Sequence, residues 1–191
     1  MELLELRIKN EGKVLKGNVL KVGSFLNQQI DVSLTESMAE DVLFHFNGKG
    51  VTKVLTVEAS GIALAYAVAR KFNAGLVYAK KQGATNVEGN VFSAPCFSYT
   101  HNKQNVLVVP KEYITSTDKI LIIDDFLANG QAVNALISIV EDAGASVVGV
   151  SCAVEKGFQG GGDALREKGI DVYSLALIDE MNENGIAFRK L

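Results

Sequence analysis

The chain has 191 residues, of which 48% are apolar and 21% are charged, and its formal net charge is −3. This balance fits one globular domain over residues 1–191, with a core large enough to fold alone. An acidic chain without a long basic run argues against general nucleic-acid binding. No run reaches the roughly 18 apolar residues of a membrane-spanning helix, and the N-terminus carries acids rather than a secretory signal. We therefore expect a cytoplasmic protein without a membrane partner.

Cysteine and histidine are too few to suggest a metal centre. Cys96 and Cys152 are far apart and lack a C-x-x-C spacing, so they predict neither a zinc site nor a disulfide framework. His45 lies in a helical pattern and is interpreted as a structural residue. With His101 as the other histidine, a histidine-rich metal site is not expected.

The first 35 residues predict a short helix followed by an irregular segment. Leucines and an isoleucine at spacings of three and four predict an amphipathic helix over residues 2–10, ended by Gly12. Val19–Val22 has the length of a short strand, which Gly23 interrupts, and Phe25–Asn27 is predicted as a loop. By itself the segment indicates only a packed cover on one side of the fold.

The rest of the chain alternates strands and helices. Ser33 or Thr35 is expected to cap a helix that runs to about Asn47. Strands and helices in alternation predict an α/β fold with right-handed βαβ units and a mostly parallel, twisted sheet flanked by helices. The predicted strands of that sheet are Val51–Val57, Gly75–Ala79, Ile120–Ile123, Ser146–Val154 and Asp171–Ile178, and the later helices cover Ala132–Ala143 and Ala164–Lys168.

Two segments lie outside this alternation. Residues from Gln82 to Asn90 are predicted as a mobile loop, and Val91–Tyr99 and Asn105–Val109 as two antiparallel strands around an H-N-K-Q turn. The C-terminal sequence N-G-I-A-F predicts a small edge ribbon.

The strand Ile120–Ile123 ends in a pattern that suits a sugar phosphate. Its four apolar residues predict burial on both faces, and Asp124 and Asp125 follow. Free N–H groups at a helix start attract an anion, and glycine allows close approach. The acids suit ribose hydroxyls, or magnesium reached through water; a plain βα turn with a solvated acidic pair is the alternative. The small and polar residues after the acids are Ala128, Asn129, Gly130, Gln131 and Ala132.

Three other strand ends carry polar groups. Ser60 and Gly61 offer a hydroxyl and a flexible backbone at a helix start, either for an anion or as a simple capped turn. Lys80 and Lys81 are either phosphate-facing cations or a solvated surface pair. Lys156 lies beyond a strand's carboxyl end, the usual site-bearing edge of an α/β sheet. The nearby run Gly160–Gly162 is predicted as a flexible turn, with the wrong spacing for a dinucleotide loop.

The stretch from Ile120 to Ala132 resembles the phosphoribosyl pyrophosphate (PRPP) motif of type I phosphoribosyltransferases. Its variant D-D-F-L-A-N-G-Q-A is particularly similar to bacterial xanthine phosphoribosyltransferases, and the resemblance extends less densely over almost the full chain. It implies the type I phosphoribosyltransferase fold, with a small hood from about residues 1–35 plus the C-terminal segment. The core would span about residues 36–178, with a flexible β-hairpin flap over the site.

The resemblance also implies an activity and a set of site residues. The activity is transfer of the 5-phosphoribosyl group from PRPP to N9 of xanthine, giving xanthosine 5′-monophosphate and pyrophosphate in purine salvage. It implies catalysis by Asp124 and Asp125 and xanthine binding by Leu20, Asn27 and Lys156. Magnesium would arrive with the pyrophosphate of PRPP, without direct protein ligands, and the family usually forms homodimers. The implied PRPP-binding residues are Ala128, Asn129, Gly130, Gln131, Ala132, Ser60, Gly61, Lys80 and Lys81.

Two alternatives and one departure from the family pattern remain. The base could instead be adenine, hypoxanthine or guanine, or the chain could be a PRPP-sensing purine regulator. Against the regulator, fewer than about 50 residues precede the first core strand, without a helix-turn-helix pattern.

Several relatives place an arginine in the loop that corresponds to residues 58–61, where this chain has the neutral Ala59 and Ser60. Backbone donors would carry pyrophosphate binding there.

Overall fold

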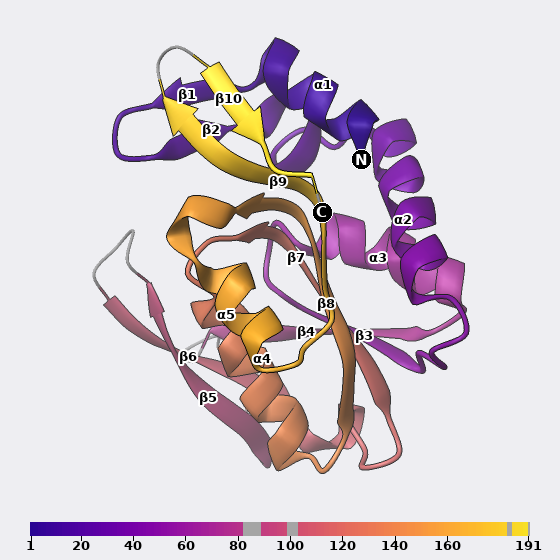
Figure 1. Cartoon of the computed structure of the whole chain (residues 1–191). Coiled ribbons are helices and arrows are strands. Elements are labelled where there is room, and N and C mark those ends of the chain that lie inside the picture. The colour runs from indigo at the N-terminus through magenta and orange to yellow at the C-terminus, as the bar shows by residue number, and fades with distance from the viewer. Residues whose placement is uncertain (82–88, 99–102, 183–184, 191) are drawn as a thin grey trace.

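The computed structural model describes residues 1–81, 89–98, 103–182 and 185–190, which contain one eight-stranded sheet (Figure 1). The strand order is β10-β9-β8-β7-β3-β4-β6-β5, with the five strands from β9 to β4 parallel. The antiparallel strands are β10 (Gly185–Phe188) at one edge and β6 (Lys103–Pro110) and β5 (Val91–Ser98) at the other. The predicted mostly parallel α/β sheet is confirmed. The parallel strands are β3 (Lys53–Val57), β4 (Gly75–Lys81), β7 (Lys119–Leu127), β8 (Ser146–Lys156) and β9 (Val172–Asn182).

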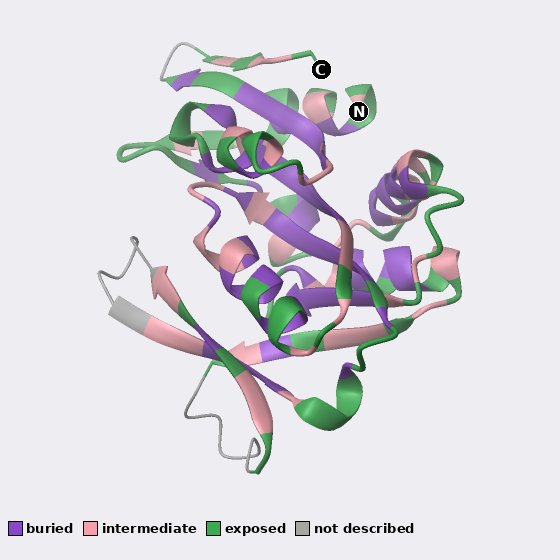
Figure 2. Ribbon diagram, turned by 60° about the horizontal axis from the view of Figure 1, so that its bottom comes forward, coloured by how far each residue is buried: buried purple, intermediate pink, exposed green. Residues whose placement is uncertain are grey.

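Helices cover both faces of this sheet. Helices α2 (Val32–Phe46) and α3 (Ile62–Phe72) pack on one face, and α4 (Gln131–Asp142) and α5 (Gly161–Glu167) lie on the other. Figure 2 shows the middle strands buried between layers whose outer surfaces are exposed. Burial on both faces explains why the middle strands read as continuous apolar runs.

The N-terminal part of the predicted hood contains α1 (Glu2–Glu11), a two-stranded hairpin and a single π-helical turn, η1 (Gly23–Asn27). The hairpin joins β1 (Lys13–Leu15) to β2 (Val19–Lys21) through a turn in which Gly17 and Asn18 adopt positive φ. The predicted loop over Phe25–Asn27 is corrected, because these residues complete η1 and bury Phe25 and Leu26 in the core.

The cap of α2 differs from the prediction. The helix begins at Val32, and the Asp31 carboxylate accepts a hydrogen bond of 3.0 Å from the Leu34 N–H, so neither Ser33 nor Thr35 is the cap. Arg7 donates to the same carboxylate at 2.7 Å. The Leu34 N–H and then Arg7 lower the pKa of Asp31. Asp31 therefore starts α2 and ties it to α1.

Several strands extend beyond their predicted ends. β7 continues through both acids to Leu127, β4 includes both lysines, and β8 ends at Lys156. The two antiparallel flap strands are confirmed. Residues 82–88 of the predicted loop Gln82–Asn90, and the first two residues of the H-N-K-Q turn, lie outside the described residues. Because neighbours in a strand point to opposite faces, the extensions decide which predicted site residues can meet.

The predicted C-terminal edge ribbon is confirmed as β10, and two short 3₁₀ turns complete the fold, η2 (Lys111–Tyr113) and η3 (Gly157–Gln159). The predicted flexible turn at Gly160–Gly162 is partly wrong, because α5 begins at Gly161 and both Gly161 and Gly162 are buried. Among the described residues, no helix is long and apolar enough to cross a membrane.

Candidate active site

A cavity of about 630 Å³ lies at the carboxyl ends of the parallel strands. Its walls come from the ends of β3, β4, β7 and β8, the start of α4, the flap strands and the tip of the hood hairpin. This is the edge of an α/β sheet where ligands bind, because the βα loops and helix N-termini converge there. The cavity therefore brings together segments that are far apart in the sequence.

The loop between β7 and α4 forms one wall, and all five residues from Ala128 to Ala132 line the cavity. Gly130 is the N-cap of α4, and its φ of 77° is one that residues other than glycine rarely adopt. The Asn134 side chain donates to the Gly130 carbonyl at 2.8 Å and fixes the loop from inside the helix. We call Ala128–Ala132 the phosphate loop, since it presents helix-start N–H groups to the cavity.

The two acids differ in their surroundings. Asp124 lines the cavity, whereas the Asp125 carboxylate accepts a 3.2 Å hydrogen bond from Asn27 Nδ2 of the hood. Their exposed fractions are only 9% and 8%. The Asp125 N–H donates to Asp124 Oδ1 at 2.9 Å. Burial, and then the charge of Asp125, raise the pKa of Asp124 well above its usual value.

This raised pKa predicts that the Asp124→Asn variant is more stable than the parent at neutral pH. The folded pKa exceeds the unfolded value of about 3.9, so folding loses stability as the pH rises through the folded pKa. An asparagine oxygen can still accept from the Asp125 N–H, and removing the buried charge should stabilise the ligand-free fold by roughly 1 kcal/mol or more at pH 8. Thermal unfolding at pH 8 and at pH 4 measures it.

The gain should shrink towards pH 4, where the parent carboxyl is protonated. A variant less stable than the parent at pH 8 would contradict the assigned cost of ionising Asp124.

The corner after β3 adjoins Asp124. A Cβ atom added to Gly61 would lie 2.4 Å from Thr56 Oγ1 and 3.3 Å from Asp124 Oδ1, so glycine allows this approach. Ser60 is exposed beside it. Glu58 lines the cavity and accepts a 2.9 Å hydrogen bond from the Lys81 N–H. Glu58 was not singled out by sequence reasoning; its place directly after a strand was the available signal.

The two lysines of β4 lie on different faces. Lys81 lines the cavity, while Lys80 Nζ lies 5.8 Å from the centroid of the Tyr78 ring, on the other side of the strand. The alternation of a strand separates them, since β4 includes both residues. The structure thus brings Lys81 but not Lys80 to the cavity, and a role for Lys80 stays a prediction.

The residues predicted to bind the base differ in their placement. Lys156 lines the cavity, donates to the Asn18 carbonyl at 2.8 Å and lies 5.5 Å from the centroid of the Phe126 ring. Burial lowers the pKa of Lys156. Phe126 also lines the cavity and offers an aromatic face; its place inside the D-D-F motif was the signal that sequence reasoning passed over. Asn27 donates to Asp125 and is not among the described residues that line the cavity.

Leu20 does not line the cavity. Its side chain is 6% exposed and packs in the hood core, while Val19 faces the cavity from the same strand. Contact between Leu20 and a base stays a prediction that would need the hood to shift.

Comparison with known proteins places this site in a family. The pattern that describes the phosphoribosyl transferase domain matches residues 21–188. The chain therefore belongs to the phosphoribosyl transferase domain family. The adenine phosphoribosyltransferase of Giardia lamblia, solved with 9-deazaadenine, has a similar fold, with a TM-score of 0.77, 22% identity and coverage of 90% of this chain and 95% of that one.

Two relatives that match almost the whole chain are xanthine phosphoribosyltransferases. The chain is 50% identical over 192 residues to the one from Bifidobacterium longum strain NCC 2705, covering 99% of this chain and 100% of that protein. It is 48% identical to the one from Lachnoclostridium phytofermentans, covering 99% and 98%. The predicted family is confirmed.

Carboxyl groups in the cavity are few. Glu58 and Asp124 line it, and within the described residues no group of three or more His, Cys, Asp or Glu side chains is placed to hold a metal ion. Two carboxylates suit Mg²⁺, which usually keeps several waters and binds proteins through one or two carboxylates plus substrate phosphates. The site thus fits a magnesium ion held mainly by a phosphorylated substrate.

Proposed function

We propose that the protein is a xanthine phosphoribosyltransferase that joins N9 of xanthine to the ribose of PRPP, releasing pyrophosphate and forming xanthosine 5′-monophosphate. The observation that carries this proposal is one cavity that holds the phosphate loop, Asp124 and Lys156 together. Identity of about 50% to proteins of this name over the full chain supports xanthine as the base. Purine salvage is the corresponding role.

The protein's own groups would act mainly by positioning and charge. The N–H groups of the phosphate loop hold the 5′-phosphate at the start of α4. Asp124 and Asp125 hold the ribose hydroxyls and stabilise the positive charge that develops on the ribose as the bond to pyrophosphate breaks. Lys81 lines the cavity, and Ser60 and Gly61 lie at the corner beside Asp124, so we assign the pyrophosphate to this side. Lys80 lies on the far face of β4.

Hydroxyl groups of the substrate would also relieve the cost of ionising Asp124. A ribose hydroxyl that donates to a carboxylate favours the charged form and opposes the raised pKa of the free protein. A magnesium ion carried by the pyrophosphate would neutralise its charge as it leaves. Among the described carboxylates, Glu58 and Asp124 line the cavity, and they would orient the water molecules of such an ion.

The two ends of the base would be read by different residues. Xanthine and hypoxanthine both carry O6 and N7 acceptors, which Lys156 can serve by donation, and adenine has a donor at C6 instead. The C2 carbonyl and N3–H of xanthine distinguish it from hypoxanthine. Asn27 is the proposed reader of that side, since its amide both donates and accepts. The Phe126 ring would stack on the base.

The Asn27→Ala variant is expected to narrow the advantage of xanthine over hypoxanthine, whereas Lys156→Ala should weaken both bases. An unpaired buried polar group costs roughly 1–3 kcal/mol, or about 5- to 150-fold in selectivity. The measurement is kcat/KM for both purines. Ser24→Ala is a matched control, because Ser24 lies in the same π-helical turn but contacts Glu11 at 3.4 Å.

An unchanged xanthine-to-hypoxanthine ratio in Asn27→Ala would remove Asn27 as the C2 reader. The ratio is the decisive quantity because Asn27→Ala also removes the hydrogen bond to Asp125. Loss of that bond alone should lower both efficiencies equally.

The proposed substrate is tested with labelled PRPP, Mg²⁺ and each base in turn. We expect the highest kcat/KM with xanthine. A preference for adenine, or for hypoxanthine and guanine, would move the protein to another branch of the family. Duplex-DNA binding in a gel-shift assay, without PRPP consumption for any purine, would favour a purine regulator.

We also propose that residues 1–191 act as one cytoplasmic catalytic domain that forms a homodimer and does not bind nucleic acid. The helices α2 and α3 expose apolar side chains that a second copy would cover, including Phe44, which is 85% exposed, Val32 and Tyr66. Sedimentation equilibrium would measure the state; a fully active monomer would contradict the dimer.

A further inference from the structure

The glycine run Gly160–Gly162 lies directly behind the phosphate loop. The Gly161 N–H donates to the Ala128 carbonyl at 3.1 Å. A Cβ atom at Gly161 would lie 2.3 Å from Ala128 O and 2.5 Å from Gly130 N, closer than real Cβ atoms come. Since both neighbours are backbone atoms, no side chain can turn aside to make room. Glycine at position 161 is therefore required for the present path of the loop.

The next glycine is packed against a buried ion pair. A Cβ atom at Gly162 would lie 2.0 Å from Glu155 Oε1 and 2.9 Å from Arg166 Nη1. Glu155 is completely buried and accepts from both Arg166 guanidinium nitrogens, at 2.9 and 2.7 Å, and from the Ser174 hydroxyl. Breaking a buried pair is strongly unfavourable, because the remaining charge has no partner. The first turn of α5 thus cannot move away from the phosphate loop on this side.

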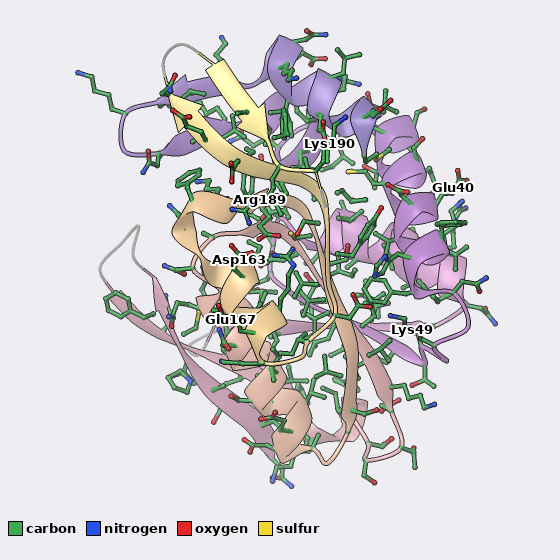
Figure 3. All side chains as sticks on the ribbon, in the orientation of Figure 1. Glu40, Lys49, Asp163, Glu167, Arg189 and Lys190 are labelled. Carbon is green, nitrogen blue, oxygen red and sulfur yellow. The ribbon has the colours of Figure 1, made fainter. Side chains whose placement is uncertain are left out.

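A second set of ion pairs ties α5 to the C-terminal strands. Asp163 pairs with Arg166 at 3.1 Å and with Arg189 at 3.0 Å, and Arg189 also pairs with Asp179 at 2.8 Å. Figure 3 shows Arg189 and Asp163 close together near the start of α5. These partly exposed pairs are individually weak, but they connect the glycine run to β9 and β10.

We propose that Gly161 is a positioning residue that sets the shape of the phosphate loop, with Gly162 and the Glu155–Arg166 pair as its support. The proposal deepens the proposed function and rests on it, since the ligand of the loop is the 5′-phosphate of PRPP. Glu155 directly precedes Lys156, so the same pair connects the strand that carries Lys156 to the helix that begins behind the phosphate loop.

The test compares Gly161→Ala with Gly160→Ala. Gly160 has φ 75°, and a Cβ atom there would meet nothing within 4 Å, so its variant carries conformational strain without touching the loop. Gly161→Ala should raise the KM for PRPP about tenfold or more while kcat at saturating PRPP changes much less, because a displaced loop first loses ground-state binding. Gly160→Ala should lower thermal stability but leave this KM within about twofold.

Amide hydrogen exchange of the ligand-free variants gives a readout that does not depend on substrate. The amides of Gly130 and Gln131 should exchange faster in Gly161→Ala than in the parent, and at the parental rate in Gly160→Ala. Equal effects of both variants, or none from Gly161→Ala, would overturn the positioning role. If the parent chain bound no PRPP, the proposed function would fail, and the exchange comparison would still decide the positioning role.

If Gly161→Ala does not fold, the proposal can still be tested on the parent protein. The Gly161 amide donates to the Ala128 carbonyl of the phosphate loop. Because bound phosphate should order this loop, the Gly161 amide should become more protected from exchange when PRPP is added. Protection unaffected by bound PRPP would also overturn the proposal.

Discussion

Asp124→Asn is expected to lower turnover with xanthine by about 10²-fold, or on the order of 3 kcal/mol of transition-state stabilisation. The substitution keeps the shape of the side chain and removes the negative charge that would stabilise the positive charge developing on the ribose. Asp124 lines the cavity and lies against Gly61, so its carboxylate is close to where the ribose and pyrophosphate would separate. The KM for xanthine should change little. Single-turnover and steady-state kinetics measure both quantities.

The matched control is Asp142→Asn on the exposed end of α4, which removes one acid from the same helix–strand unit without touching the cavity. Its turnover should equal that of the parent. If Asp124→Asn folded and kept parental turnover, its carboxylate would not stabilise the transition state. A loss of turnover together with a gain in stability would instead mean that a buried charge is kept for catalysis at the expense of the fold.

Gly130→Val should weaken PRPP binding by about 10²-fold while the fold survives. A β-branched residue at φ 77° is strained, and its side chain would crowd Asn134 and Gly161, both within 3.6 Å of the added Cβ. The N–H groups at the start of α4 would then no longer converge on one phosphate. Calorimetric titration with PRPP measures the effect.

Gly169→Val is the control for conformational strain. Gly169 has φ 80° and nothing within 4 Å of its added Cβ, and it lies after α5, away from the cavity. It should lose stability but bind PRPP normally. Equal weakening by both variants would assign the effect to general destabilisation and would contradict a specific phosphate loop.

The sequence predicts the parts of the site that depend on local pattern. The apolar run before Asp124 places β7 in the middle of the sheet, and the small residues after it place Gly130 at a helix start with positive φ. Both features follow from periodicity and from the backbone freedom of glycine. The parallel sheet follows from the alternation of strands and helices, and it alone brings Lys156 to the same edge.

What the sequence does not predict depends on strand length and on distant partners. β4 is two residues longer than predicted, so Lys80 and Lys81 belong to the strand and point to opposite faces. No local sequence pattern predicts where this strand ends. The three-residue strands of the hood hairpin are too short for a periodic signal, so the burial of Leu20 in the hood core could not be foreseen. The Glu155–Arg166 pair joins β8 to α5, and it can be recognised only when the positions of both elements in the fold are known.

The most direct test of the proposed function is the product formed from xanthine and PRPP in the presence of Mg²⁺. We expect xanthosine 5′-monophosphate and pyrophosphate in equal amounts, with formation of both nearly abolished in Asp124→Asn. Chromatography with mass detection identifies the nucleotide. Absence of xanthosine 5′-monophosphate with the folded parent chain, while another purine is converted or PRPP is merely bound, would contradict the proposed function.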